Sequence, residues 1–192
     1  MKGLLLVALA LFFFSSCATV GPRFGRRLPY EAKVYLLDAE EDLMTAKARA
    51  DQQWREVHTA KKAVGAAEDR FDNLRESPLA GEAKAQVKVA QAQLTREERL
   101  LELLDAAAVC AERRYVATRS RAEVKFKVNG ADEAEANDLA DRATACEAKL
   151  EKKQVAVAEA EEALSRARSE QERASIAAAQ KAPLENPRPW IE

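Results

Sequence analysis

The fold of this chain is decided by residues 36–74, which read LLDAEEDLMTAKARADQQWREVHTAKKAVGAAEDRFDNL. Apolar side chains return every seven residues, and a second set follows each of them three residues later. Their members are Leu36, Leu43, Ala50, Val57, Val64 and Phe71, and Ala39, Ala46, Gln53, Ala60, Ala67 and Leu74. This spacing places both sets on one face of an α-helix, at the a and d positions of a coiled coil. The stretch therefore predicts one long helix that packs along a single seam.

The same repeat returns twice downstream. Pro78 separates the first repeat from the second, and the Asn-Gly pair at 129–130 separates the second from the third, because such residues favour turns. We therefore expect three helices, over residues 30–76, 79–128 and 133–181. The downstream sets are Val87, Leu94, Leu101, Ala108, Tyr115 and Ala122 with Ala90, Glu97, Leu104, Ala111 and Thr118, then Ala136, Ala143, Leu150, Val157, Leu164 and Gln171 with Leu139, Cys146, Lys153, Ala160, Ala167 and Ala174.

The helix starts carry capping signals. Ser77 before Pro78 is expected to cap the second helix, and Asp132 with Glu135 is expected to cap the third. Because the connections are short, consecutive helices are expected to run antiparallel. At about 1.5 Å per residue, each helix would be on the order of 70 Å long. The sequence thus predicts an all-α fold, an elongated antiparallel three-helix coiled-coil bundle over residues 30–181.

A register for this bundle follows from turns centred near residues 80 and 130. Most of the resulting layers combine large with small side chains, as close packing requires. Examples are Val57/Leu104/Val157, Ala60/Leu101/Ala160 and Ala50/Ala111/Leu150. Two layers are polar: one joins Gln53 to Ala108 and Lys153, and the other contains Glu97. These layers either fix the register or mark a loose part of the core.

The composition of the chain disfavours several classes of function. The 192 residues carry 31 Lys and Arg against 32 Asp and Glu, so bulk charge does not favour a nucleic-acid partner. The only histidine, His58, falls on the solvent side of the first helix. Histidine-based catalysis and a Glu-x-x-His bundle metal site therefore lack their residues, and Gly-rich phosphate-binding loops are missing. We expect no enzyme activity, no metal and no cofactor.

The first residues have the layout of an export signal. Lys2 precedes an uncharged stretch over residues 3–14, which is too short to span a bilayer. The segment Leu11-Phe12-Phe13-Phe14-Ser15-Ser16-Cys17 resembles the lipobox of bacterial lipoproteins. The alternative is an ordinary secretory signal that is cleaved nearby.

The lipobox resemblance implies a cellular location for the chain. Residues 1–16 would be a removed signal peptide, and Cys17 would be acylated and would attach the chain to a membrane. Residues 17–29, which contain Gly and Pro, would form a flexible tether. In a host with two membranes, Ala18 after the cysteine would favour the outer membrane, facing the periplasm. The implied location is the bacterial cell envelope.

Cys110 and Cys146 remain once Cys17 is assigned to lipid. An exported chain meets an oxidising compartment, which favours a disulfide. The register, however, places Cys146 beside Ala46 and Tyr115, with Cys110 about five residues away along the helix. Three outcomes stay open: an intramolecular disulfide, two buried thiols, and an intermolecular link through Cys110.

Several segments are candidates for contact with a partner. Leu100, Leu103, Ala107 and Cys110 form an additional stripe on the second helix, and Val34, Leu37 and Met44 form another on the first. These stripes are either interfaces or parts of a broader buried face. The tail over residues 182–192 contains three prolines and ends with Trp190, Ile191 and Glu192, so it is expected to be extended. Trp190 and Ile191 would suit docking to a partner, although the tail can equally fold back or stay unbound.

The functional expectation is a lipid-anchored structural protein. It would act as a helical spacer or scaffold that presents contacts to an envelope protein or to a second copy of itself. The alternative is an adaptor or regulatory subunit of a secretion, efflux or motility complex, which would use its exposed stripes as a helix-in-groove ligand.

Overall fold

The computed structural model describes residues 28–181. These residues form five helices and no strand: α2 (Tyr30–Val34), α3 (Leu37–Asn73), α4 (Ala80–Lys125), α5 (Glu133–Glu147) and α6 (Leu150–Lys181). The described part of the chain is therefore all-α. The predicted signal peptide with Cys17, and the tail with Trp190 and Ile191, lie outside the described residues.

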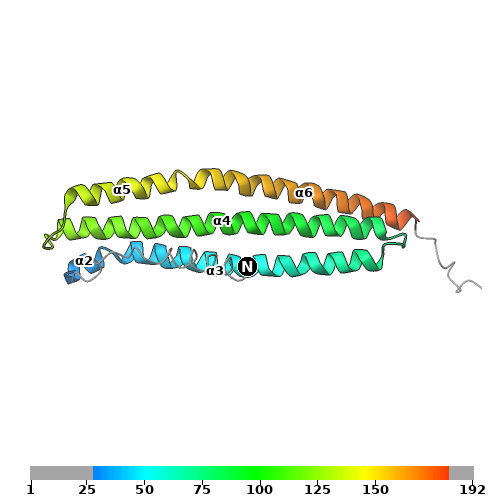
Figure 1. Cartoon of the computed structure of the whole chain (residues 1–192), viewed down its shortest axis with the longest axis horizontal. Coiled ribbons are helices and arrows are strands. Elements are labelled where there is room, and N and C mark those ends of the chain that lie inside the picture. The colour runs from blue at the N-terminus through cyan, green and yellow to red at the C-terminus, as the bar shows by residue number, and fades with distance from the viewer. Residues whose placement is uncertain (1–27, 182–192) are drawn as a thin grey trace, which may run out of the picture.

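The helices line up as three long rods (Figure 1). α3 forms the first rod, α4 the second, and α5 with α6 the third. α4 lies between the other two rods and packs against α3 on one side and against α5 and α6 on the other. α3 has no comparable packing against α5 or α6. With 46 residues, α4 extends for about 70 Å.

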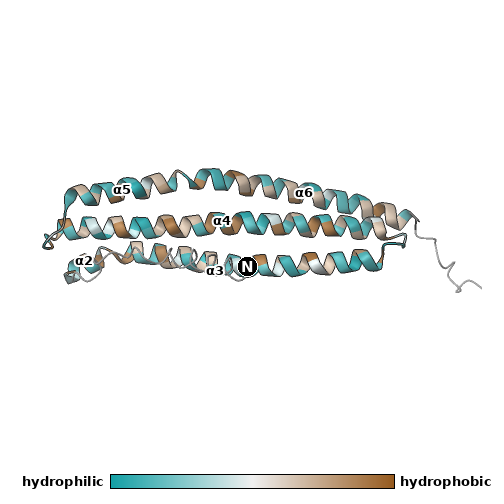
Figure 2. Ribbon diagram, in the orientation of Figure 1, coloured by the Kyte–Doolittle hydropathy of each residue, from teal (hydrophilic) through white to brown (hydrophobic). Residues whose placement is uncertain are grey.

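The core between the rods consists mostly of small side chains. Alanine supplies most of the buried apolar residues, and Leu36, Val57 and Leu164 are among the few larger ones. Hydrophobic and hydrophilic residues alternate along all three rods (Figure 2). None of the predicted a and d side chains is exposed. The seven-residue repeat therefore identifies the packed faces.

Two of the three predicted helices, the first and the third, are interrupted where no break was expected. Tyr35 and Leu36 separate α2 from α3, and Ala148 with Lys149 separates α5 from α6. Neither interruption contains glycine or proline, the residues that normally signal a helix end. The predicted continuous helices over residues 30–76 and 133–181 are therefore each divided in two.

Of the two predicted N-terminal caps, the one by Asp132 is confirmed and the one by Ser77 is wrong. The Asp132 side chain accepts a hydrogen bond from the Ala134 amide at 2.9 Å, which caps α5. Ser77 does not cap α4, which begins at Ala80. Its Oγ instead accepts from the Leu79 amide at 3.2 Å. Ser77 therefore belongs to the turn before the helix.

The predicted register is wrong on both sides of α4. Tyr115 was placed beside Ala46, but its hydroxyl donates to Glu40 Oε1 at 3.3 Å, more than a helical turn earlier in α3. Cys146 was placed beside Tyr115, but it lies against Cys110. The first turn, between Asn73 and Ala80, is centred before residue 80, which shifts α3 against α4. The second turn, between Lys125 and Glu133, is centred close to residue 130 as expected, so its position does not account for the shift of α5.

Candidate functional site

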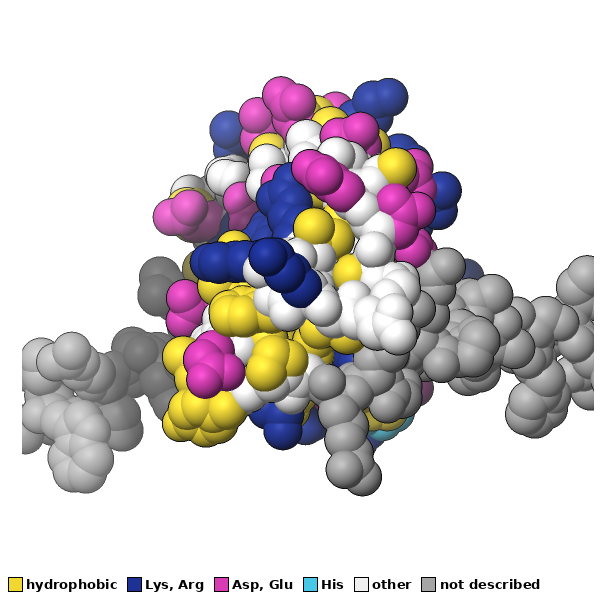
Figure 3. Space-filling view, turned by 90° about the vertical axis from the view of Figure 1, so that its left-hand side faces the viewer, with side chains coloured by type: hydrophobic (Ala, Val, Ile, Leu, Met, Phe, Trp, Pro, Cys, Tyr) yellow, Lys and Arg dark blue, Asp and Glu magenta, His cyan; other side chains and the backbone are white. Residues whose placement is uncertain are grey.

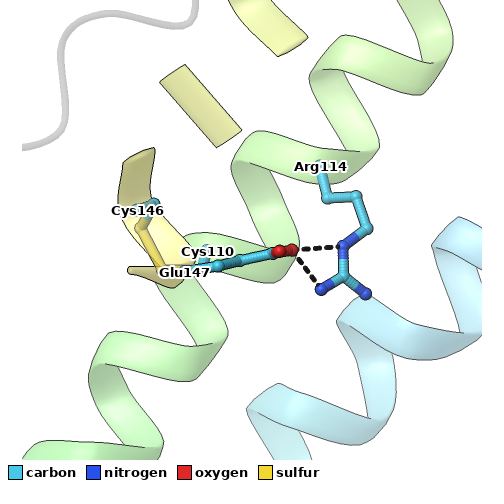
Figure 4. The surroundings of a disulfide bond; sticks show 4 residues. All are labelled: Cys110, Arg114, Cys146 and Glu147. Atoms are coloured by element: carbon cyan, nitrogen blue, oxygen red, sulfur yellow. Dashed lines mark hydrogen bonds and ion pairs between the residues drawn. A yellow bond between two sulfur atoms is a disulfide. The ribbon is translucent and has the colours of Figure 1, made fainter. Parts of the chain in front are cut away.

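Cys110 of α4 and Cys146 of α5 are joined by a disulfide, with a Cα–Cα distance of 5.5 Å (Figure 4). Both residues are buried, at 2% and 6% exposure. Cys146 lies in the last turn of α5, directly before the interruption that separates α5 from α6. The bond therefore fixes the C-terminal end of α5 to α4, the central rod.

Arg114, one turn after Cys110, connects all three rods beside the disulfide. Its Nε donates to Glu147 Oε1 at 3.0 Å, and its Nη1 donates to Asp42 Oδ2 at 3.3 Å. Figure 4 shows the guanidinium directed at the Glu147 carboxylate. The hydrogen bond to Glu147, partly opposed by desolvation and assisted by the charges of Glu147 and Asp42, raises the pKa of Arg114. Both neighbouring rods thus bind the same cation of α4.

A second polar group connects the rods further along. The Gln53 amide donates to Glu97 Oε2 at 2.6 Å and to the Glu97 carbonyl at 3.2 Å. Arg96 donates to Glu97 Oε1 at 2.8 Å and to Glu161 Oε1 at 3.3 Å. The hydrogen bond to Glu97 is the largest cause of the raised pKa of Arg96. The sequence placed Gln53 and Glu97 in separate layers, whereas here they form one layer, which we call the central polar layer (Gln53, Arg96, Glu97 and Glu161).

The polar side chains of these two groups are paired with one another across the helices. Every carboxylate in them is close to an amide or a guanidinium, and Gln53 and Glu97 are buried. His58 is exposed and stacks on Trp54, with ring centroids 5.9 Å apart. Within residues 28–181, no group of three or more His, Cys, Asp or Glu residues is arranged to hold a metal ion.

The predicted stripe on α4 is not freely exposed. Leu100, Leu103 and Ala107 are half-buried, and Cys110 is occupied by the disulfide. This position follows from the place of α4 between two rods, which cover two sides of it. A seven-residue pattern on one helix does not reveal how many neighbours that helix has.

Some of the exposed apolar side chains are found at the α2 end of the rods, and others, such as Trp54, Val155 and Ile176, are spread along the helices. Tyr30, Val34, Tyr35 and Leu37 are all among the exposed large hydrophobic residues. The predicted stripe on the first helix contained Val34 and Leu37, together with Met44, which is 68% exposed in α3. It did not include the two tyrosines. Spacing could have identified Tyr30, since apolar residues at 30, 34 and 37 recur at intervals of four and three. Tyr35 falls outside this pattern.

Among the helices of the described part, none combines the length and apolar character needed to cross a membrane. No protein-family model, curated protein or solved structure matches this chain.

Proposed function

We propose that this chain is a lipid-anchored, non-enzymatic protein of a bacterial cell envelope, in which an antiparallel three-helix coiled-coil bundle acts as a spacer or scaffold. The observation that carries the proposal is the elongated shape of the three packed rods, of which the central one, α4, extends for about 70 Å. A molecule of this shape, anchored at the end that carries α2, would hold a partner bound at the opposite end at a defined distance from the anchor. Its polar contacts, described above, serve to align helices.

The anchor is supported by the lipobox-like segment that ends at Cys17. The bonded pair of Cys110 and Cys146 favours the same location, because disulfides persist in oxidising compartments outside the cytoplasm. We place the mature chain at the outer membrane, facing the periplasm, on the basis of Ala18.

The anchor is tested by intact mass and membrane fractionation of the full chain and of a Cys17→Ser variant. We expect the wild-type protein to lack residues 1–16, to carry acyl mass and to sediment with membranes, whereas Cys17→Ser retains none of these properties. A wild-type protein without acyl mass would contradict the anchor.

The spacer role is tested by crosslinking in cells. Deletion of residues 183–192 is expected to remove a crosslinked partner from the far end while helicity, measured by circular dichroism, stays unchanged. Unchanged crosslinks would show that residues 183–192 do not bind the partner.

A second candidate function is an adaptor of an envelope machine. It is favoured by Trp54, which is 61% exposed on the outer face of α3 with His58 stacked on it, because exposed tryptophans are frequent anchors of interfaces. Trp54→Ala would then lose the crosslinked partner that the tail deletion retains. The matched control is Val155→Ala, an exposed apolar residue of α6.

A further inference from the structure

One end of the rods carries exposed apolar side chains that the proposed spacer role does not use. Tyr30, Val34, Tyr35 and Leu37 are 77%, 50%, 47% and 56% exposed. Figure 3 views this end and shows hydrophobic side chains gathered over part of it, with Lys and Arg side chains beside them. We call these four residues the apex.

The apex is the outer side of a segment whose inner side is already packed. Ala32 and Leu36, at 0% and 2% exposure, form a small core cluster with Ala122 of α4. Tyr115 and Phe126 pack against this cluster. A surface segment with its core on one side normally carries polar residues on the other. Here both sides carry apolar residues. The inner side packs in this cluster, and on the outer side Lys125 of α4 contacts the Tyr35 ring, while all four apex side chains stay at least 47% exposed.

The chemistry of the apex is amphipathic. Lys125 Nζ lies 4.6 Å from the centre of the Tyr35 ring, and Lys33 lies between Tyr30 and Val34 in the sequence. Glu31 and Asp38 carry opposite charge on the same segment. Tyrosine and lysine side chains with an apolar body and a polar tip are typical of the boundary between a bilayer and water.

The covalent structure of the chain keeps this end near a membrane. Eleven peptide steps separate Cys17 from Leu28, the first described residue, and they span at most about 40 Å when fully extended. The rod is longer than this reach. The apex is therefore at high local concentration at the surface that holds the lipid, whereas the far ends of α4 and α6 are not confined in this way.

We propose that the apex inserts into the headgroup region of the bilayer to which the lipid on Cys17 attaches the chain, so that the rods stand end-on to the membrane. This inference rests on the proposed lipid anchor. The apolar and aromatic side chains drive the insertion, because the charges of the segment nearly cancel. The turn between α3 and α4 would then be presented far from the bilayer.

The test uses the full mature protein in vesicles of phosphatidylethanolamine and phosphatidylglycerol with brominated acyl chains. A polarity-sensitive fluorophore is attached to Leu37→Cys in one sample and to Ile176→Cys in another. Ile176 is a matched control because it is 54% exposed and lies at the opposite end of the rods. Cys110 and Cys146 are bonded to each other and do not react with the label. Intact mass, measured on each sample, reports acylation of Cys17 independently.

We expect the label at position 37 to be quenched at least about threefold more than the label at 176. Combining Tyr30→Ser with Val34→Ser should abolish this difference, whereas Val155→Ser should leave it unchanged. Equal quenching at both positions would mean that the rods lie flat, and no quenching at 37 in an acylated, vesicle-bound protein would mean that the apex stays in water. Either result overturns the inference and leaves the anchor intact. Absence of acyl mass overturns both proposals.

Discussion

Lys127 follows the end of α4 with a backbone φ of 54°, a conformation that L-residues adopt at a cost and that glycine adopts freely. The Val128 amide donates to the Glu123 carbonyl at 2.9 Å, and the Lys127 amide donates to the Val124 carbonyl at 3.0 Å. This pair of bonds is the Schellman motif, whose corresponding position is usually glycine. The local geometry thus holds a lysine in the place of the preferred residue.

Replacing Lys127 by glycine should stabilise the protein by about 1 kcal/mol, because the strain at φ 54° is relieved. Urea unfolding followed by circular dichroism measures the change. Lys127→Ala is the control, since it removes the same charge and keeps the Cβ atom. Equal stability of the two variants would show that backbone strain is not the cause.

Glu170 titrates below the usual range of a glutamate. Its Oε2 atom accepts from Lys88 Nζ at 2.9 Å across α4 and α6, and this hydrogen bond, with the lysine charge, lowers the pKa of Glu170. A lowered folded-state pKa means that the stabilisation is present above the unfolded pKa and is lost as pH falls through the folded pKa. Lys88→Met should therefore raise the pKa of Glu170 towards its ordinary value in a carboxylate NMR titration. Lys84→Met, one turn away on α4, should leave the Glu170 midpoint in place.

Among the elements, α5 depends most on a single covalent bond. It packs against α4 and has little packing against α6, and the interruption at Ala148 and Lys149 separates it from the remainder of its rod. The disulfide near its end closes a loop with a sequence separation of 36. A loop of this size is expected to stabilise the folded chain by about 3–4 kcal/mol in the chain-entropy account.

Replacing Cys110 and Cys146 together by alanine should therefore lower the free energy of unfolding by about 3–4 kcal/mol. Hydrogen exchange should accelerate first in α5, because α6 keeps its own packing against α4. Wild-type protein treated with a reductant should show the same pattern. Unchanged protection of α5 in the reduced protein would mean that its packing on α4 is sufficient without the bond.

For the molecule as a whole, the sequence predicts which faces pack but not how the rods align. The repeat is local: residues such as Val57 and Ala60 share a helix face whatever lies opposite. The alignment depends on non-local contacts, and an alanine-rich seam changes little when one rod slides by a turn. The disulfide between Cys110 and Cys146 and the contact of Tyr115 with Glu40 are both non-local. The interruption at Tyr35 and Leu36 also lacks a local signal. The apex was missed in part for the same reason, since its inner face is defined by α4.

The central polar layer is the feature best suited to hold the alignment of the rods. It joins α3, α4 and α6 through Gln53, Glu97, Arg96 and Glu161. A slide of α3 by a turn would bring Ala50 or Val57 to the position of Gln53, so that Glu97 Oε2 would lose its amide donor, and a buried polar atom without a partner costs about 1–3 kcal/mol. The alanine layers impose no comparable cost, so this layer discriminates between registers that apolar packing does not distinguish.

Gln53→Leu should accordingly destabilise the protein by about 2 kcal/mol, because Glu97 loses its amide donor while remaining buried. Combining Gln53→Leu with Glu97→Leu should recover much of this loss, so that the double-mutant cycle gives a coupling of about 1–2 kcal/mol. The matched control is the pair of Lys61 and Glu98, which joins the same two helices at 3.5 Å with side chains about half exposed, and whose coupling should stay below about 1 kcal/mol. Urea unfolding of the single and double variants provides all of these values. A coupling in the buried pair no larger than that in the exposed pair would show that the layer does not fix the register, and that the turns at 74–79 and 126–132 set it alone.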